Sequence, residues 1–394
     1  MKILIINSGS SSIKYQLIQM PQEAVICQGI IERIGTKDAL LQFQSTTTEL
    51  KKLQEIENHK EGLIKISEYL LDAEIGVIKD VNEIDAVGHR VVHGGESFSE
   101  TTLINKAVKD KIELYAELAP LHNPHNLEGI LLAEQIFPSA SQVAVFDTAF
   151  HQSIPIKASK YAIPNEYYTQ YGIKVYGFHG TSHKFVSEKA IDFLHLKTSK
   201  IITIHLGNGC SITAVKDGKS IDHSLGFGPS NGLIMGSRSG DIDHSIIFHM
   251  VNSLGYDLDK INTILNKKSG MLGLTGYSDL RDIQSEADNG NKDCLLALAM
   301  NAYRIKKYIG AYTAAMNGLD AIVFTAGIGE NSSKLRQLIC NEMEYLNIEL
   351  DDSKNEFKDK NIRTIHKTNA KVKILVVPTN EELEIAKQTF QILN

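Results

Sequence analysis

The chain has 394 residues, of which 42% are hydrophobic and 22% are charged. These fractions are typical of a folded globular protein, and they exclude a disordered chain, which has fewer apolar residues and a larger charge imbalance. A chain of this length is expected to form roughly two to three domains. The net charge of −6, without any block of Lys and Arg, excludes a general nucleic-acid-binding surface, because such a surface must neutralise phosphates.

Cysteine usage and hydropathy indicate a cytoplasmic protein. The four cysteines are far apart in the sequence and include no C-x-x-C pair, so they indicate neither a zinc site nor a disulfide framework. We expect them to be small buried residues in a reducing compartment. The apolar run at residues 1–6 is too short for the core of a signal peptide, and no run approaches the roughly 18 apolar residues of a membrane span.

In chain order, the first expected elements are strands joined by a turn rich in Gly and Ser. A short apolar run at residues 3–6 ends in the turn at residues 7–12 (NSGSSS). Strand-like runs at residues 13–18 and 24–31 follow this turn. We therefore expect the chain to open with a hairpin and a third strand.

The same order of features recurs in the second half of the chain. An apolar run at residues 201–204 ends in the turn at residues 205–209 (HLGNG), and residues 210–215 form the returning strand. Asp217-Gly218 is a two-residue hairpin signal that leads into a third run at residues 219–222. This weak repeat predicts two related α/β domains, each opening with a Gly-containing hairpin.

Each half also contains a later apolar strand, at residues 143–147 in the first half and 321–325 in the second. Helical periodicity separates the strands, and the expected helices cover residues 61–71, 106–118, 127–137, 185–194, 291–316 and 382–393. We expect one domain at residues 1–151, to which the C-terminal segment 382–394 returns, and a nucleotide-binding domain at residues 152–381.

The two Gly-containing turns suit a nucleotide held between the domains. Gly lets the backbone approach phosphate oxygens closely, and successive N–H groups form an anion-binding concavity. One such turn alone could be an ordinary tight turn, but a pair at matching positions favours phosphate binding. Neither turn matches the P-loop pattern G-x-x-x-x-G-K-[ST], and Gly327-Ile328-Gly329 lacks the third Gly of a dinucleotide-binding motif.

Two arginines lie close to glycines, Arg90 in GHRVVHGG at residues 88–95 and Arg238 in GSRSGD at residues 236–241. An Arg flanked by Gly can reach a ligand without competing bulk, and its planar fork matches a carboxylate or a phosphate. A surface Arg in a turn is the commoner situation for either one, but the pair together favours anion recognition.

Asp147 and the glutamate pair near the C-terminus are further candidates for chemistry. Asp147 ends an apolar strand, where open α/β sheets place catalytic groups, although an Asp there can also cap the next segment. Glu382 would complete a capping box with Thr379, which leaves Glu381 free for chemistry.

Three histidines lie in suggestive places. His179 lies in a glycine-bounded turn before a helix that Thr181 or Ser182 would cap. A metal pair formed by His179 and His183 lacks an evident third ligand. His122 lies between prolines and is either catalytic or a structural loop residue.

Together these motifs resemble the acetate kinase family, within the superfold shared by actin, sugar kinases and heat-shock chaperones. The resemblance covers essentially the whole chain and rests on seven segments in the same order, at residues 7–15, 88–96, 146–151, 177–183, 205–209, 325–331 and 378–383. It implies an α/β fold of two related actin-like (ribonuclease H-like) domains with the nucleotide in the interdomain cleft. It also implies a homodimer.

The resemblance implies a role for each motif residue. Asn7 and Glu381 would serve a Mg²⁺ site, at which Mn²⁺ could replace Mg²⁺. Asp147 would be the catalytic acidic residue, His179 and Arg238 would stabilise the transferring phosphoryl group, Arg90 would bind the acyl substrate, and His122 would be a further catalytic residue. The acyl tail would lie against Val92, Leu121, Phe178 and Pro229. The residues expected to bind ATP or ADP are Lys14, His205, Leu206, Gly207, Asn208, Gly209, Asp279, Leu280, Arg281, Gly327, Ile328, Gly329, Glu330 and Asn331.

The implied activity is reversible, magnesium-dependent phosphoryl transfer from ATP to acetate, giving acetyl phosphate and ADP. The sequence departs from the family's usual pattern at Ser8, where Ala is usual, and at Leu280, where Phe is common. It also has GPSNG at residues 228–232 in place of Thr-Pro-Leu-Glu-Gly beside the acyl pocket, so propionate or butyrate is the alternative substrate. An ATPase like actin or a chaperone is the alternative from another class, and it would need no acyl-binding Arg.

Overall fold

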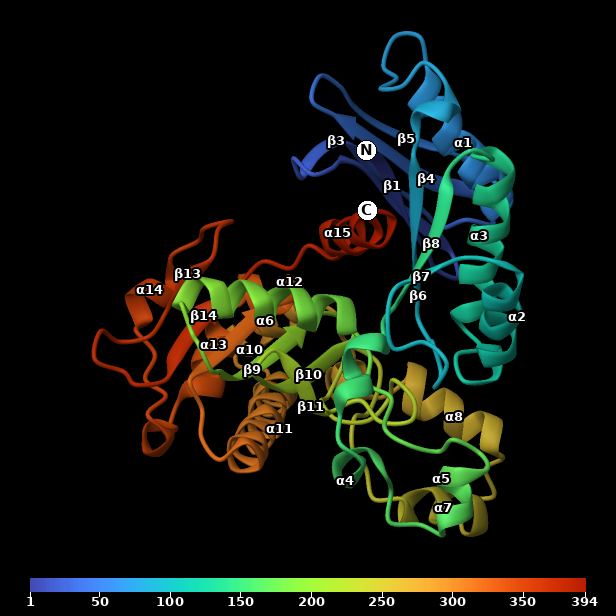
Figure 1. Ribbon diagram of the computed structural model, residues 1–394. Coiled ribbons are helices and arrows are strands. Elements are labelled where there is room, and N and C mark those ends of the chain that lie inside the picture. Colours follow the sequence, from blue (N-terminus) through green and yellow to red (C-terminus); the bar gives the residue numbers. More distant parts are fainter. The chain divides into compact units, whose positions relative to one another are not determined.

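The computed structural model describes residues 1–394, which divide into two compact units (Figure 1). Unit 1 comprises Met1–Phe150 and Asn380–Asn394, and unit 2 comprises His151–Thr379. The expected boundaries lie after residue 151 and before residue 382, so Glu381, which we expect in the second domain, belongs to unit 1 instead. None of the helices combines the length and the apolar composition that crossing a membrane requires.

The sheet of unit 1 has eight strands in the order β5-β4-β3-β2-β1-β6-β8-β7. The strands are β1 (Lys2–Ser8), β2 (Ser12–Gln19), β3 (Ala24–Glu32), β4 (Thr36–Ser45), β5 (Glu49–Ile56), β6 (Ala86–Val91), β7 (Thr102–Leu103) and β8 (Ser141–Phe146). The helices are α1 (His59–Leu71), α2 (Lys106–Leu114), α3 (Asn123–Ile136) and α15 (Glu381–Leu393), with 3-10 turns at Val81–Glu83 and Tyr115–Glu117.

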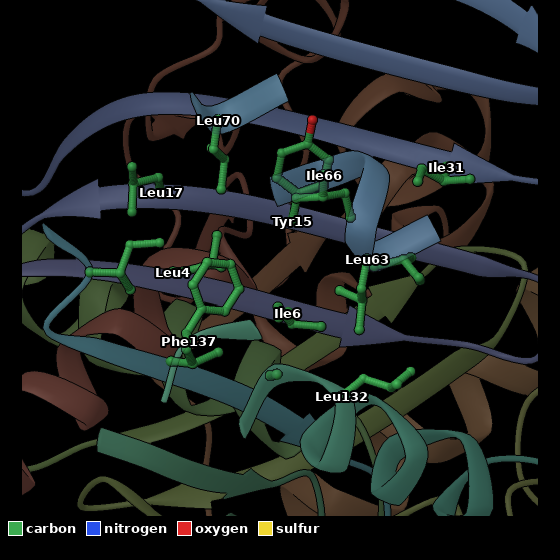
Figure 2. Packing of buried hydrophobic residues seen from close by; sticks show 14 of the residues in the cluster. Leu4, Ile6, Tyr15, Leu17, Ile31, Leu63, Ile66, Leu70, Leu132 and Phe137 are labelled. Atoms are coloured by element: carbon green, nitrogen blue, oxygen red, sulfur yellow. The ribbon is translucent and has the colours of Figure 1, made fainter. Parts of the chain in front are cut away.

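β1 is buried on both faces, which explains its unbroken run of Ile and Leu. Leu4 and Ile6 pack in one cluster with Phe137 and with apolar residues of α1 (Figure 2). Ile3 and Ile5 pack in another cluster, with residues of α15. Because side chains alternate along a strand, each face of the sheet receives half of the run. The packing on both faces fixes the ends of β1 and of its neighbour β6, where the polar motif residues lie.

The sheet of unit 2 has six strands in the order β11-β10-β9-β12-β14-β13. The strands are β9 (Lys200–Leu206), β10 (Cys210–Lys216), β11 (Lys219–His223), β12 (Ala321–Thr325), β13 (Arg363–Thr364) and β14 (Lys373–Val376). The helices are α4 (Ile156–Ser159), α5 (Asn165–Thr169), α6 (Gly180–Leu194), α7 (Ser245–Asn252), α8 (Leu258–Lys267), α9 (Gly270–Thr275), α10 (Leu280–Asp288), α11 (Lys292–Met316), α12 (Ala326–Asn331), α13 (Ser333–Cys340) and α14 (Asp352–Glu356). Further 3-10 turns cover Ala149–Ser153, which spans the boundary of the units, and Glu344–Leu346.

The two sheets share one topology, which confirms the α/β class and the repeat. In each unit an antiparallel three-stranded meander, β1-β2-β3 or β9-β10-β11, pairs through its first strand in parallel with a later strand. A further parallel strand follows, β8 beside β6 and β14 beside β12. The two later strands singled out in the sequence, β8 and β12, are therefore not equivalent. Apolar composition marks every central strand alike, so it does not assign a strand its position in the sheet.

Five strands, β4, β5, β7, β13 and β14, have no counterpart among the expected elements, and one strand boundary differs from expectation. In β4 and β5 most of the side chains are exposed or half-buried, so the apolar pattern is weak. The sequence before Arg90 predicts a strand only at residues 85–87, but β6 extends to Val91, so Arg90 lies inside the strand and not after it. The four cysteines are free and buried, as expected.

The predicted capping box at the start of α15 is wrong. Asn380 is the N-cap, and its side-chain oxygen accepts a hydrogen bond from the backbone N–H of Leu383 at 2.9 Å. Glu382, which we expect to pair with Thr379, instead forms an ion pair with Lys14 of β2, with 2.6 Å between the carboxylate oxygen and Nζ. The helix starts one residue later than a Thr379 cap requires, and Asn is at least as good a cap as Thr.

Replacing Asn380 by Ala should lower the free energy of unfolding by about 0.5–2 kcal/mol, because α15 loses the acceptor for one of its free N–H groups. Asn380→Ser retains an acceptor oxygen and serves as the control, which should stay close to the parent protein. Denaturant unfolding measures both variants. A loss found in Thr379→Ala but absent from Asn380→Ala would place the cap where the sequence suggested it.

Candidate active site

The candidate residues of unit 1 lie where parallel strands end. β6 and β8 run parallel, with Val91 beside Phe146 in register. Asp147 directly follows β8, and its backbone N–H donates to the carbonyl of Val91 at 2.9 Å. This register brings the Asp147 carboxylate next to the Arg90 side chain, although the two residues are far apart in the sequence.

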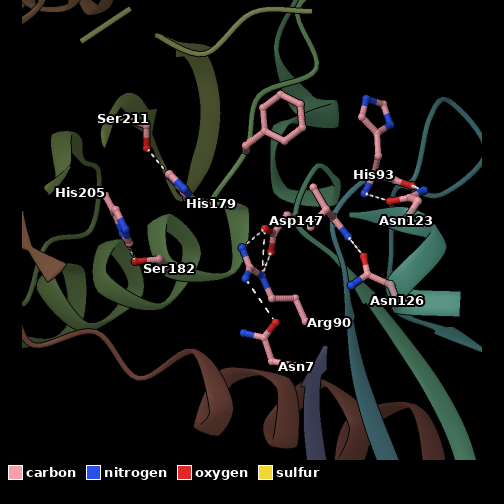
Figure 3. A network of polar contacts seen from close by, with 12 residues as sticks. Asn7, Arg90, His93, Asn123, Asn126, Asp147, His179, Ser182, His205 and Ser211 are labelled. Atoms are coloured by element: carbon pink, nitrogen blue, oxygen red, sulfur yellow. Dashed lines mark hydrogen bonds and ion pairs between the residues drawn. The ribbon is translucent and has the colours of Figure 1, made fainter. Parts of the chain in front are cut away.

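Arg90 and Asp147 form a buried ion pair (Figure 3). Arg90 Nε donates to both carboxylate oxygens at 3.0 Å, and Nη2 donates to Oδ2 at 2.5 Å. Arg90 Nη1 donates to Asn7 Oδ1 at 3.4 Å. Burial alone would lower the pKa of Arg90, but the charges of Asp147 and then Glu381 raise it above its ordinary value. The guanidinium group of Arg90 is therefore oriented by Asp147 and stays charged.

α15 brings two further carboxylates to this end of unit 1. Glu382 is buried and pairs with Lys14, as described above. Burial raises the pKa of Glu381, and the positive charge of Arg90 only partly opposes that rise. The negative charges of Asp147 and Glu382 raise it further. Three carboxylates thus interact with two cationic side chains, and Glu381 is the carboxylate that lacks a cation of its own.

The donor set of unit 1 fits a magnesium ion. Mg²⁺ prefers oxygen ligands and is usually bound through one or two carboxylates, with water completing its shell. A dication would relieve the excess negative charge that raises the pKa of Glu381. Glu381 would supply a carboxylate oxygen and Asn7 an amide oxygen, and their roles as metal ligands remain predictions.

Two asparagines that the sequence analysis did not single out hold the loop after β6 (Figure 3). Asn126 Oδ1 accepts from the backbone N–H of Val92, and Asn123 Oδ1 accepts from that of His93, both at 3.0 Å. Both asparagines are buried. They lie three residues apart on α3, and residues at that spacing share one face of a helix. That spacing is the signal by which the sequence could have revealed them.

The residues expected around the acyl tail are divided between the two units. Val92 is buried in unit 1, whereas Leu121, just before α3, is 60% exposed. His122 directly precedes α3 as well. Phe178 and Pro229 belong to unit 2. Their assembly into a single acyl pocket remains a prediction, as does a nucleotide cleft between the domains.

Unit 2 contains a pocket of about 650 Å³, a size that suits a small-molecule ligand. Three segments expected to bind the nucleotide meet there: the β9–β10 turn, the start of α10, and α12. The lining residues are Gly207, Asn208, Asp279, Leu280, Arg281, Gly327, Ile328 and Asn331, together with Ser278, Gln284 and Ser332, which the sequence analysis did not single out. Leu206 lines a narrower adjoining hollow. The other candidates, Lys14 in unit 1 and His205, Gly209, Gly329 and Glu330 in unit 2, are not among the lining residues.

A buried arginine that the sequence analysis overlooked holds α12 in place. Arg336 is 2% exposed, and its Nη1 donates to the carbonyls of Gly329 at 2.8 Å and Glu330 at 3.0 Å. Its Nε and Nη2 donate to the side chain and the backbone carbonyl of Asn355, both at 2.8 Å. Burial, and secondarily the charge of Arg363, lowers the pKa of Arg336 to about 10. Arg336 looks like any other polar residue of an amphipathic helix in the sequence, so nothing there distinguishes it.

His179 is fixed by the hydroxyl of Ser211 (Figure 3). His179 is the N-cap of α6 in a left-handed conformation, so the expected caps Thr181 and Ser182 lie inside the helix. Ser211 Oγ lies 2.9 Å from His179 Nδ1 and also 2.7 Å from His183 Nε2. One hydroxyl thus joins the two imidazoles that the sequence suggested as a metal pair.

Arg238 and His179 both approach the β9–β10 turn of unit 2, which contains Gly207 and Gly209 and is expected to bind phosphate. A Cβ placed on Gly209 would lie 3.5 Å from His179 Nε2 and 4.0 Å from Arg238 Nη1, which are ordinary contact distances, so both side chains border the space beside this glycine. Arg238 Nη1 donates to the carbonyl of Pro229 at 3.0 Å. No carboxylate lies within ion-pair distance of Arg238, and burial lowers its pKa. A desolvated cation without a counter-ion is suited to an anionic ligand.

The whole chain is similar to proteins of one family. The acetokinase family model matches residues 2–387, a range that includes every candidate residue. An acetate kinase of Flavobacterium johnsoniae is 65% identical over 393 residues, with 100% of both chains covered. The crystal structure of Porphyromonas gingivalis acetate kinase matches with a TM-score of 0.94 at 44% identity and covers 100% of both chains. The crystal structure of a propionate kinase from Francisella tularensis matches with a TM-score of 0.93 at 42% identity and covers 98% of both chains.

Replacing Glu381 by Gln should stabilise the metal-free protein above the raised pKa of Glu381, because it removes a charge that burial and Asp147 disfavour. Since folding raises this pKa above its ordinary value of 4.5, protonation of Glu381 favours the fold. The advantage of Gln should therefore shrink as the pH falls through the raised pKa. Melting temperatures from pH 4 to 8, with and without Mg²⁺, measure both effects.

Mg²⁺ should stabilise the parent protein more than Glu381→Gln, and the variant should lose magnesium-dependent turnover. Glu384→Gln, on the same helix, is the control and should keep the response to Mg²⁺. An unchanged stabilisation by Mg²⁺ in Glu381→Gln would show that Glu381 is not a metal ligand.

Proposed function

The chain belongs to the acetokinase family, and we propose that its two sets of candidate residues transfer the γ-phosphoryl group of ATP to acetate, giving acetyl phosphate and ADP. The protein is an enzyme, a phosphotransferase with a carboxyl group as acceptor. Family membership disfavours an ATPase of the actin or chaperone kind. We propose, in addition, the roles of individual residues, the binding of Mg²⁺ and the oligomeric state.

The observation that carries the proposal is the convergence of His179 and Arg238 on Gly209. Phosphoryl transfer requires positioning and charge neutralisation more than covalent help from the protein. A half-buried arginine without a carboxylate partner, next to the glycine of this turn, supports neutralisation of the transferring group. Gly207 and Asn208, in the same turn, line the pocket that we assign to the nucleotide.

Acetate needs no general base, because a carboxylic acid with a pKa near that of Glu, about 4.3, is already ionised at neutral pH. Arg90 would orient the acetate carboxylate through Nη1, since Nε and Nη2 are engaged by Asp147. Asp147 therefore acts as the residue that orients Arg90 and adds negative charge beside Glu381. Mg²⁺, when bound, would neutralise charge on the phosphate oxygens.

We also propose a homodimer located in the cytoplasm. The region of α7 and α8 exposes a run of large apolar side chains, Ile246, Phe248, Val251, Leu254 and Leu258. A second copy of the chain would remove such a patch from water. The four free, buried cysteines suit a reducing compartment.

Arg238→Ala should lower kcat by about 10²-fold or more, the scale of a lost transition-state donor. Arg238→Lys should restore little of the activity, because an ammonium group cannot reproduce the planar fork. Steady-state kinetics on variants with a parent-like melting temperature measure the effect. A folded Ala variant with near-normal kcat would remove Arg238 from the catalytic residues.

Acetate should be the preferred acid, propionate should be accepted with a lower kcat/KM, and butyrate should be poor. Each further methylene that fits is worth about 0.8 kcal/mol of burial, whereas one that does not fit costs more. Val92→Ala removes two methyl carbons from the expected wall, so it should lower KM for propionate more than for acetate.

The kcat/KM values of the three acids on the parent protein decide the substrate. The similarity to a propionate kinase structure makes propionate the second candidate, because the fold does not distinguish the two acids. Higher kcat/KM with propionate or butyrate would retain the reaction class and overturn acetate as the substrate.

A further inference from the structure

A cluster of two histidines and a glutamate lies between α1 and α3 of unit 1, and none of its members has a role in the reaction proposed above. His59 opens α1, and His125 and Glu128 lie three residues apart on α3. Glu128 Oε2 is 4.0 Å from His59 Nδ1 and 3.8 Å from His125 Nδ1. All three ligand atoms lie within 4.8 Å of one another.

These separations are close to those of a bound transition-metal ion. Two ligand atoms that are each about 2.1 Å from a zinc ion cannot be more than roughly 4.2 Å apart. Both distances to Glu128 already satisfy this limit. The His59 and His125 rings stack at 21° with 5.3 Å between their centroids, so the His125 ring, whose side chain is 33% exposed, would have to turn for both nitrogens to face one cation.

The hydrogen bond of His59 already selects the tautomer that a metal requires. His59 Nε2 lies 2.6 Å from the carbonyl oxygen of Gly9. A carbonyl only accepts, so Nε2 carries the proton and Nδ1 of the neutral ring presents a lone pair. Metal-binding histidines commonly donate their second ring N–H to a backbone carbonyl in this way. The ring of His59 is buried and therefore held in this orientation.

We propose that His59, His125 and Glu128 bind a divalent transition-metal cation, best matched by Zn²⁺, at a site separate from Asn7 and Glu381. Two imidazoles and one carboxylate, with water as the fourth ligand, form a familiar zinc set. Imidazole ligands favour zinc-class ions, whereas Mg²⁺ prefers oxygen. Glu128 is 45% exposed, so the cation can enter from solution.

The bound cation would restrict the motion of the first Gly-containing turn of the chain, at residues 7–12. α1 contacts this turn through His59 and the Gly9 carbonyl. α3 contacts it through Asn126 Nδ2, which donates to the carbonyl of Ser8 at 2.8 Å. A cation that joins α1 to α3 would therefore hold Ser8 and Gly9 through both helices.

Calorimetric titration of the metal-free, full-length protein with Zn²⁺, in excess Mg²⁺ to occupy the oxygen-ligand site, tests the proposal. The parent protein should show saturable binding at a single site, and His125→Ala and Glu128→Gln should each weaken it by at least about 10–100-fold, the loss found when even an outer-shell partner is removed. Zn²⁺ should also slow amide exchange at Gly9, whose N–H donates to Ser12.

His244→Ala is the matched control, because His244 is an exposed histidine 4.0 Å from a carboxylate, that of Asp243, and belongs to no group of three ligands. It should bind Zn²⁺ as the parent does. The side chains of His125 and Glu128 are partly exposed, so both variants should keep the parent melting temperature without zinc. If one variant misfolds, the other still tests the site. Absence of saturable binding by the parent, or parent-like affinity in both variants, would overturn the site.

Discussion

The arrangement of buried charge in unit 1 is the constraint on which the candidate site depends. Asp147 holds Arg90, Glu382 holds Lys14, and Glu381 is left without a cation of its own. The carboxylates of Asp147 and Glu382 are buried, whereas the Lys14 side chain is 54% exposed. Burying charged groups is expensive, and apolar residues of similar size often serve stability as well or better. We therefore interpret this cluster as a device for orienting Arg90 and for attracting a cation, and not as a source of stability.

Unit 2 has the opposite imbalance. Arg238 has no carboxylate partner, and Arg336 donates its hydrogen bonds to neutral backbone carbonyls and a side-chain amide oxygen. The pocket near these residues is lined by a Gly-containing turn and by α12. Glu381 of unit 1 thus lacks a cation, and Arg238 of unit 2 lacks an anion.

Much of the fold could be predicted from the sequence because its signals are local. Apolar runs ending in Gly-containing turns mark β1 and β9, and the order of motifs along the chain revealed the repeat. Strand positions in the sheet were harder, because β8 and β12 are equally apolar yet occupy different places. β4 and β5 escaped notice because few of their side chains are buried.

The site was predictable where a residue's neighbours in sequence define its role, and less so where distant contacts do. The turn at Gly207 and the residues of α12 do line a common pocket. The partner of Glu382 is Lys14, hundreds of residues away in the chain, and only the folded β2–α15 contact reveals it. The same holds for Arg336, whose importance lies in the carbonyls of Gly329 and Glu330 that it binds.

The most direct test of the account is the dependence of ADP formation on acetate, measured together with trapping of the product by hydroxylamine. The purified protein with ATP and Mg²⁺ should form ADP only when acetate is present, with one acetyl hydroxamate for each ADP. ADP formation at the same rate without acetate, or without any trapped acyl phosphate, would contradict phosphoryl transfer to a carboxylate.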